Sequence, residues 1–414
     1  MIMKFSEYLK EEKNTHMTHL EDQVIYGGVN GARSAILGLR SLRDMLAGES
    51  ATSTDVTMKW DGAPAVFCGQ DPADGKFFVA KKGIFNKNPK VYKSESDIDE
   101  DIPGADLNAK MKIAFQELSK LGIKGVVQGD IMFTSDDLKK ENIDGDSYIT
   151  FHPNTIVYAV PMSSDEAKRI RQARIGVVFH TTYKGKDFES MRASYGVDVD
   201  KFRKVKSVWA QDATVRDLSG SVTLTKSETA EVTKALSLAG KIFKQISSTT
   251  LKQIENNQDL AKTIETYNNT FVRASKPIGD TKKHVDGLIK YIENKYQKEI
   301  DKLKSEKGKA GKAAKRDEFL KFFSDSNKRN LKLLFDLQKA IVVAKLKIIN
   351  KLNKLNKMNT FVKTKNGFKV TGAEGFVAID KIGGGAVKLV DRLEFSANNF
   401  SPDIIKGWDK PSRS

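Results

Sequence analysis

The segment Val56–Pro64, with the sequence VTMKWDGAP, joins a short apolar strand pattern to a lysine and an Asp-Gly turn. Lys59 ends the strand-like run, and Asp61-Gly62 directly after it favours a tight turn. A lysine at a strand end that opens into a cleft loses solvation. Desolvation lowers the pKa of a lysine below its usual value of about 10.4. A lower pKa favours the neutral amine, which is the nucleophilic form. The segment therefore predicts a nucleophilic lysine or, as the simpler alternative, an ordinary turn lysine.

Strand-like runs also lie on both sides of a long helical region, residues 225–358, which has few Pro or Gly. The runs before it are 55–58, 65–69, 76–80, 124–132, 148–151, 155–160 and 175–182, and those after it are 361–363, 367–371, 375–380 and 386–390. The simplest account is one α+β domain, interrupted by a helical insertion, whose final strands return to the first sheet. The expected division is an N-terminal helical segment 1–50, a first domain part 51–224, the insertion 225–358 and the last strands 359–414.

The charge of the 414-residue chain points to a polyanionic partner. It has 70 Lys and Arg against 53 Asp and Glu, a formal charge of +17, which favours nucleic acid over a membrane. Residues 301–360 alone hold 17 basic and six acidic side chains. Lys347, Lys351 and Lys354 lie beside an apolar helical stripe there. They are candidate nucleic-acid-binding residues, and the alternative is the solvated face of a helical bundle.

Several classes of protein are excluded by composition. One cysteine, Cys68, rules out internal disulfides and cysteine-rich zinc sites, and the five histidines show no HExxH grouping. There is no GxxxxGK[ST] loop and no apolar run long enough to span a membrane.

Six motifs occur in order along the chain. They are Lys59-Trp60-Asp61-Gly62, Phe77–Gly83, Gly125–Ile131 with Asp130, Thr155–Val160 with Tyr158, Glu374–Val377, and Ala386–Val390 with Lys388. In this order they resemble the motifs of the covalent nucleotidyltransferase superfamily, which includes ATP-dependent DNA ligases, RNA ligases and mRNA capping enzymes. The resemblance covers roughly residues 55–160 and 367–392, and it does not include the helical region.

The resemblance implies a ligase-type nucleotidyltransferase domain with antiparallel sheets, split by the insertion, and two-step chemistry with ATP and Mg²⁺. Lys59 would attack the α-phosphate, pyrophosphate would leave, and AMP would pass to an RNA or DNA end. Lys388 and Lys82 would neutralise phosphate charge. The implied nucleotide-binding residues are Asp61, Gly62, Asp130, Tyr158 and Glu374. Asp130 and Glu374 would also hold the metal, since carboxylates are hard oxygen ligands. Phe151 rivals Tyr158 for stacking on adenine, and core packing is the alternative for both.

The chain also departs from the superfamily pattern. Pro64 stands where an arginine is frequent, and Asp130 stands where a glutamate is usual. Only about 22 residues follow Arg392, so no C-terminal OB-fold is expected after the last motif. The helical insertion would then have to grip the nucleic acid, which favours RNA ligation or the repair of broken ends.

The N-terminal segment Met3–Glu12 is short and amphipathic. It resembles the capsid-targeting peptides of internal head proteins in T4-like phages, and Leu9-Lys10-Glu11 fits their cleavage pattern, which implies a cleavable targeting peptide of residues 1–11. The alternative is an ordinary first helix. This resemblance implies a location in the cytoplasm of an infected host, with packaging inside the virion as a further expectation.

Three hypotheses for the function follow. The first is an ATP-dependent polynucleotide ligase that acts through Lys59-AMP. The second is a non-catalytic nucleic-acid-binding phage head protein on a ligase-like scaffold, suggested by Pro64 and Asp130. The third is a capping-type enzyme or adenylyltransferase that acts on another acceptor.

Overall fold

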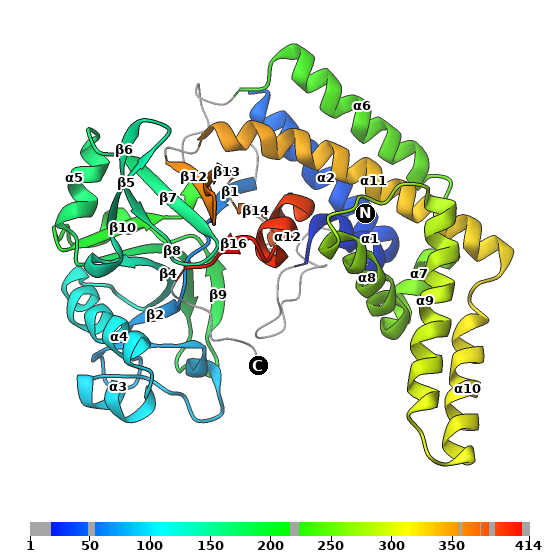
Figure 1. The fold of residues 1–414 in the computed structure, drawn as a ribbon, viewed down its shortest axis with the longest axis horizontal. Coiled ribbons are helices and arrows are strands. Elements are labelled where there is room, and N and C mark those ends of the chain that lie inside the picture. The colour runs from blue at the N-terminus through cyan, green and yellow to red at the C-terminus, as the bar shows by residue number, and fades with distance from the viewer. Residues whose placement is uncertain are drawn as a thin grey trace.

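The computed structural model describes residues 18–48, 54–215, 223–355, 358–372, 374–380 and 386–407. They form a mixed α+β structure in which a sheet-rich lobe lies beside a helical lobe (Figure 1). The predicted targeting peptide, residues 1–11, lies outside the described residues. Among the described helices, none has the length and apolar composition needed to cross a membrane.

The secondary structure has the following bounds. The α-helices are α1 (Gln23–Tyr26), α2 (Gly28–Leu46), α3 (Glu95–Asp101), α4 (Ala105–Leu118), α5 (Asp165–Gln172), α6 (Lys226–Phe243), α7 (Ser248–Asn256), α8 (Gln258–Arg273), α9 (Thr281–Asp301), α10 (Glu306–Leu320), α11 (Asp325–Leu352) and α12 (Arg392–Phe400). The strands are β1 (Thr54–Lys59), β2 (Ala65–Gln70), β3 (Phe77–Ala80), β4 (Val126–Thr134), β5 (Lys139–Ile143), β6 (Asp146–Phe151), β7 (Ile156–Pro161), β8 (Ile175–Lys184), β9 (Arg192–Tyr195), β10 (Val208–Asp212), β11 (Thr214–Val215), β12 (Asn359–Thr364), β13 (Gly367–Val370), β14 (Gly375–Asp380), β15 (Ala386–Leu389) and β16 (Ile404–Ile405).

A four-stranded sheet, in the order β11-β1-β14-β15, joins the two ends of the chain. β1 pairs with β14 in an antiparallel register that runs from Thr54 opposite Asp380 to Lys59 opposite Gly375. The predicted return of the final strands to the first sheet is therefore confirmed. Side chains alternate between the two faces of a strand. Val56 and Phe376 thus face the helical core, while Lys59 lies on the opposite face.

Two six-stranded sheets form the other lobe. One has the order β10-β8-β4-β2-β3 with β9 beside β8, and the other has the order β13-β12-β7-β6-β5 with β16 beside β12. All pairings in them are antiparallel except that of β10 with β8. The sheets share a core that includes Phe133 and Trp209 from the first and Phe151 and Tyr158 from the second.

The helical lobe includes more of the chain than the predicted insertion. Leu39 and Leu42 of α2 are buried in the same apolar cluster as Leu236 of α6 and Ile341 of α11. The segment 1–50, expected to be separate, therefore contributes α1 and α2 to this lobe. The face of the four-stranded sheet that carries Phe376 completes the cluster.

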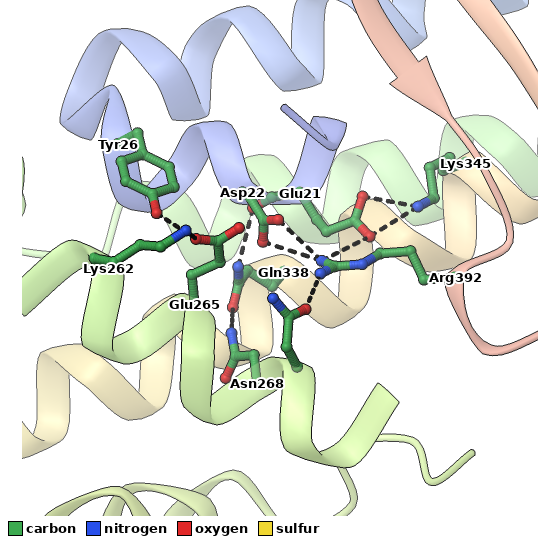
Figure 2. Close-up of polar contacts among 10 residues, drawn as sticks. Glu21, Asp22, Tyr26, Lys262, Glu265, Asn268, Gln338, Lys345 and Arg392 are labelled. Carbon is green, nitrogen blue, oxygen red and sulfur yellow. Dashed lines mark hydrogen bonds and ion pairs between the residues drawn. The ribbon is translucent and has the colours of Figure 1, made fainter. Parts of the chain in front are cut away.

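A buried ion-pair network ties the N-terminal segment to the helical lobe and to the start of α12 (Figure 2). Glu21 accepts hydrogen bonds from Lys345 Nζ at 2.9 and 2.7 Å, and Arg392 Nη1 donates to both carboxylate oxygens of Asp22 at 3.2 and 3.0 Å. Burial alone raises the pKa of Glu21, but Lys345 and Arg392 outweigh it and lower the pKa to about 2. Glu21 is therefore charged at neutral pH and depends on its cationic partners.

Removing one partner from this network should be costly. In Lys345→Ala, Glu21 loses both hydrogen bonds from Lys345 and keeps only the longer ion pair with Arg392, at 3.6 Å, so the free energy of unfolding should fall by about 3 kcal/mol. Lys347→Ala is the matched control, because Lys347 lies on the same helix and pairs with Glu231 at the surface. It should cost less than about 1 kcal/mol. Thermal and urea unfolding followed by circular dichroism measure both, and equal losses would contradict the buried role of Lys345.

Candidate active site around Lys59

Lys59 ends β1, and Glu374 immediately precedes β14, so the β1–β14 pairing brings the two side chains together. Lys59 Nζ forms an ion pair with Glu374 Oε1. The Lys59 side chain is 27% exposed, whereas that of Glu374 is 5% exposed. Glu374 Oε2 is buried and has no hydrogen-bond partner among the described residues. The pair therefore has one open end, at the amine, and one unsatisfied acceptor.

The ionisation of this pair differs from the sequence prediction. Burial lowers the pKa of Lys59, but Glu374 and, more weakly, Asp61 and Asp130 raise it further, so the net pKa lies above the usual lysine value. The predicted desolvated, neutral amine is thus wrong for this state. Burial raises the pKa of Glu374 to about 7, although Lys59 opposes the shift.

Lys388 shares the sheet face of Lys59. It lies on β15 opposite Val377, which in turn pairs with Thr57, two residues before Lys59. Burial, followed by the charge of Lys59, lowers the pKa of Lys388. The lowered pKa that the sequence predicts for Lys59 is therefore found at Lys388. The backbone N–H of Lys388 donates to Thr18 O at 3.3 Å, so the N-terminal segment covers this edge of the sheet.

Asp61 holds the loop that follows Lys59. Its carboxylate accepts hydrogen bonds from Asn154 Nδ2 at 2.8 Å and from the backbone N–H groups of Thr155 at 2.6 Å and Ile156 at 2.9 Å. These bonds fix the Lys59 loop to the start of β7. The oxygens of Asp61 are thus already engaged, and in this structure Asp61 is a positioning residue.

Gly62 and Pro64 lie in the loop that follows Lys59, and both contact β4. A Cβ on Gly62 would lie 2.6 Å from the Cβ of Asp130 and 2.8 Å from Met132 Sδ, so only glycine fits there without a shift. Pro64, which stands where an arginine is frequent in the superfamily, accepts a hydrogen bond at its carbonyl from Ile131 N at 3.0 Å. Asp130 therefore lies directly under the Lys59 loop.

Asp130 is partly exposed and faces a histidine that the sequence analysis did not select. His180 Nε2 lies 3.6 Å from Asp130 Oδ2, and His180 Nδ1 lies 2.7 Å from Thr181 Oγ1. This pair results from the β4–β8 pairing, which the sequence of β8 alone does not reveal. Within the described ranges, no group of three or more His, Cys, Asp or Glu side chains is arranged to hold a metal by itself.

Tyr158 does not fit the predicted role of stacking on adenine. It is 2% exposed, and its ring is stacked on Phe151 at a centroid distance of 5.3 Å, with Trp60 at 5.1 Å. Its hydroxyl accepts a hydrogen bond from Asp61 N at 2.7 Å. Tyr158 therefore supports the Lys59 loop from within the core, and its rival Phe151 is also buried there.

Lys82 stays outside the cluster. It is exposed at the start of a 3-10 turn, Lys82–Phe85, that follows β3. Among the described residues, no hydrogen bond or ion pair joins Lys82 to Lys59, Glu374 or Asp130. The predicted phosphate contact of Lys82 therefore remains a prediction.

A pocket adjoins Glu374 and Asp61. Its other walls come from the end of α11, with Asn353, and from α12, with Glu394 and Phe395. Asn353 Oδ1, like Glu374 Oε2, is buried without a hydrogen-bond partner in the part of the chain that the structure describes. Two of the residues that line the pocket thus each hold an unsatisfied buried acceptor, which suits a ligand that carries hydroxyl or amino donors.

The helix α12 is the main part of the site that sequence reasoning missed. The Phe395 ring centroid lies 5.9 Å from Lys59 Nζ, a contact of the cation–π type. Asn399 Oδ1 accepts from Thr155 Oγ1 at 3.0 Å, which anchors α12 to the loop that Asp61 also holds. Asp391 at the N-cap was a usable sequence signal, because its carboxylate accepts from the N–H groups of Leu393 and Glu394.

Two of the three lysines predicted to bind nucleic acid are engaged within the helical lobe. Lys347 pairs with Glu231, and Lys351 pairs with Glu228 at 2.7 Å and is 9% exposed. Both bonds join α11 to α6, which favours the helical-bundle alternative for the buried Lys351, whereas the nucleic-acid contact of the partly exposed Lys347 remains a prediction. Lys354 is exposed and has no ion pair among the described residues.

A protein-family model matches residues 14–403, and that family, DUF6267, is described as one of unknown function. Among curated proteins and solved structures, no significant match to the chain is found. Similarity therefore assigns no activity, and the chemistry of the Lys59 cluster has to carry the functional argument.

The ionisation of Lys59 can be tested directly. In Glu374→Gln the main partner that raises the pKa of Lys59 is lost while burial remains, so the pKa should fall. Labelling of Lys59 by an amine-specific reagent at pH 8 should then increase several-fold, as measured by peptide mass spectrometry. Glu394→Gln is the control, because Glu394 lines the same pocket without pairing with Lys59. Unchanged or lower labelling in Glu374→Gln would contradict the assignment.

Proposed function

The chain belongs to the DUF6267 family, and on that premise we propose that it is an ATP-dependent polynucleotide ligase that acts through a lysyl-AMP intermediate on Lys59. The observation that carries this proposal is the convergence of Lys59, Glu374, Lys388 and Asp130 on one site. These residues come from motifs that are separated by up to about 330 positions in the sequence. Their order along the chain resembles that of the covalent nucleotidyltransferases.

The first chemical step is a transfer of AMP to Lys59. The Lys59 amine, after loss of a proton, forms a bond to the α-phosphorus of ATP, and the bond to the pyrophosphate oxygen breaks. Glu374 Oε1, which forms the ion pair with Lys59, is the adjacent proton acceptor. Lys388, on the same sheet face, neutralises charge on the phosphate.

Mg²⁺ fits this site as a companion of the nucleotide. Mg²⁺ is usually bound by one or two carboxylates together with substrate phosphates, so a complete protein cage is not required. The unsatisfied Glu374 Oε2 and the partly exposed carboxylate of Asp130 are the oxygens that would hold it. When bound, Mg²⁺ neutralises phosphate charge and favours the neutral form of the nearby lysine.

The acceptor in this proposal is an RNA or DNA end. AMP passes from Lys59 to a 5′-phosphate, and a 3′-hydroxyl then displaces AMP as the strands are joined. The basic charge of the chain, +17 overall, supports a polyanionic substrate of this kind. A capping-type enzyme or another adenylyltransferase would share the first step but would not join strands.

A second candidate function is a non-catalytic nucleic-acid-binding protein on the same scaffold. The observation that favours it is the raised pKa of Lys59, which keeps the amine protonated beside Glu374. Pro64 and Asp130, which depart from the superfamily pattern, point the same way.

Self-adenylation separates these candidates. Incubation with α-³²P ATP and Mg²⁺, followed by denaturing electrophoresis, should label the wild-type protein. Lys59→Ala should abolish the label, and Lys388→Ala should reduce it at least tenfold, because it removes charge neutralisation at the phosphate. Lys354→Ala is the control, since Lys354 is exposed and lies on the helical lobe, and it should label normally.

The same assay defines the opposing outcomes. A wild type that takes no label, or a label that survives in Lys59→Ala, would exclude the lysyl-AMP mechanism. A labelled protein that fails to seal nicked duplexes and broken RNA stems would instead be an adenylyltransferase.

A further inference from the structure

The hairpin of α9 and α10 projects from the helical lobe, away from the sheet-rich lobe (Figure 1). α10 buries no side chain completely. Its contacts with α9 include the ring pair Tyr296–Phe319, at a centroid distance of 6.2 Å, and Lys312 Nζ over the Tyr296 ring at 5.3 Å. The far end of the hairpin is therefore an extended surface that packs against little else.

The turn of this hairpin together with most of α10, residues 302–316 (the basic tip), is strongly basic. It contains seven Lys or Arg and a single acidic residue, Glu306. Lys309, Lys312 and Arg316 have acidic partners. Four more lysines are exposed and have no ion pair among the described residues: Lys302, Lys304, Lys307 and Lys315.

Stability of the hairpin does not explain this composition. Lysines in the first half of α10 face the positive end of the helix dipole, which disfavours them. Gly308 and Gly311 each cost about 1 kcal/mol relative to alanine inside a helix. A Cβ on Gly311 would meet no atom within 4 Å, so no close packing requires glycine there. The pattern is unfavourable for a free helix, and no fully buried side chain of α10 offsets it.

The geometry of the basic tip suits a phosphate backbone. Lys307, Gly311 and Lys315 follow an i, i+4, i+8 spacing and so lie on one face of α10. Lys307 and Lys315 are about 12 Å apart along the helix axis, which is roughly the axial length of three nucleotides in one duplex strand. The glycine between them leaves room for a backbone to approach closely.

We propose that the basic tip binds the phosphate backbone of nucleic acid without reading its bases. In its choice of polyanion this inference rests on the proposed function, but it concerns a separate surface and needs no chemistry at Lys59. A membrane is disfavoured, because Leu303 is the only large apolar side chain between residues 302 and 316 and membrane-binding helices carry an apolar face. The basic tip is a different surface from Lys347 and Lys351, which form ion pairs with Glu231 and Glu228 within the helical lobe.

The test compares two variants of the full-length protein with equal loss of charge. The tip variant changes Lys302, Lys304, Lys307 and Lys315 to Gln. The matched control changes Lys226, Lys234, Lys241 and Lys244 to Gln, which are exposed on or at the end of α6, far from the basic tip in Figure 1. Fluorescence anisotropy with labelled single-stranded and duplex oligonucleotides is measured from 50 to 200 mM salt, and circular dichroism checks that each variant is folded.

The tip variant should bind at least about tenfold more weakly at 0.1 M salt, and the slope of log affinity against log salt should become shallower by about 3 units, as expected for four lost phosphate contacts. The control should change affinity by less than about twofold. A tip variant in which the four lysines become Arg should bind like the wild type, because the positive charges are kept.

Three results would overturn the proposal. They are equal losses in the tip and control variants, unchanged binding in the tip variant, and tip-dependent binding to phosphatidylserine vesicles without oligonucleotide binding. Self-adenylation is measured on the same samples. A tip variant that loses oligonucleotide binding while the wild type takes no label would support the basic tip and refute only the lysyl-AMP proposal.

Discussion

The antiparallel pairing of β1 with β14 is the constraint on which the rest of the molecule depends. It joins residues 54–59 to residues 375–380 across most of the chain, and everything between them has to close into one loop. One face of the pair carries Val56 and Phe376 into the core of the helical lobe, and the other carries Lys59 toward Glu374. Because strand faces alternate with a period of two, a one-residue shift of β14 would turn Phe376 away from the helical core, and the same shift of β1 would turn Lys59 into it. Packing of the helical core and formation of the Lys59–Glu374 ion pair therefore depend on the same strand register.

Local pattern was sufficient to predict many of the strands but few of the contacts between distant segments. The predicted run 375–380 coincides with β14, and 65–69 nearly coincides with β2, because β-branched and aromatic residues between turn signals mark strands well. The place of α2 in the helical lobe, the position of α12 beside Lys59 and the contact of His180 with Asp130 were missed. Each depends on which surfaces meet after folding, and a single sequence carries no direct signal for that.

The lysines show why charge patterns alone are ambiguous. Lys345 and Lys351 occur in the same basic helix, yet both are buried against glutamates that come from α6 or from the N-terminal segment. A helical spacing identifies which residues share a face, but it does not identify the acidic partner opposite that face. The same limit applies at the site, where the acidic neighbours of Lys59 raise its pKa while burial beside Lys59 lowers that of Lys388. The expected burial indicated that lysine pKa values at the site would be shifted. Only the three-dimensional arrangement shows which pKa is raised and which is lowered.

The wide separation of β1 and β14 also sets the time at which the site can exist during synthesis. Lys59 leaves the ribosome long before Glu374 and Lys388, which follow it by 315 and 329 residues. Until β14 and β15 are added, the apolar face of β1 has no neighbouring strands from the C-terminal segment, and Lys59 has no Glu374 beside it. Incomplete chains that stop before residue 374 therefore lack the site, and premature termination yields products without the Lys59 cluster. The topology in this way ties the assembly of the cluster to the synthesis of β14 and β15.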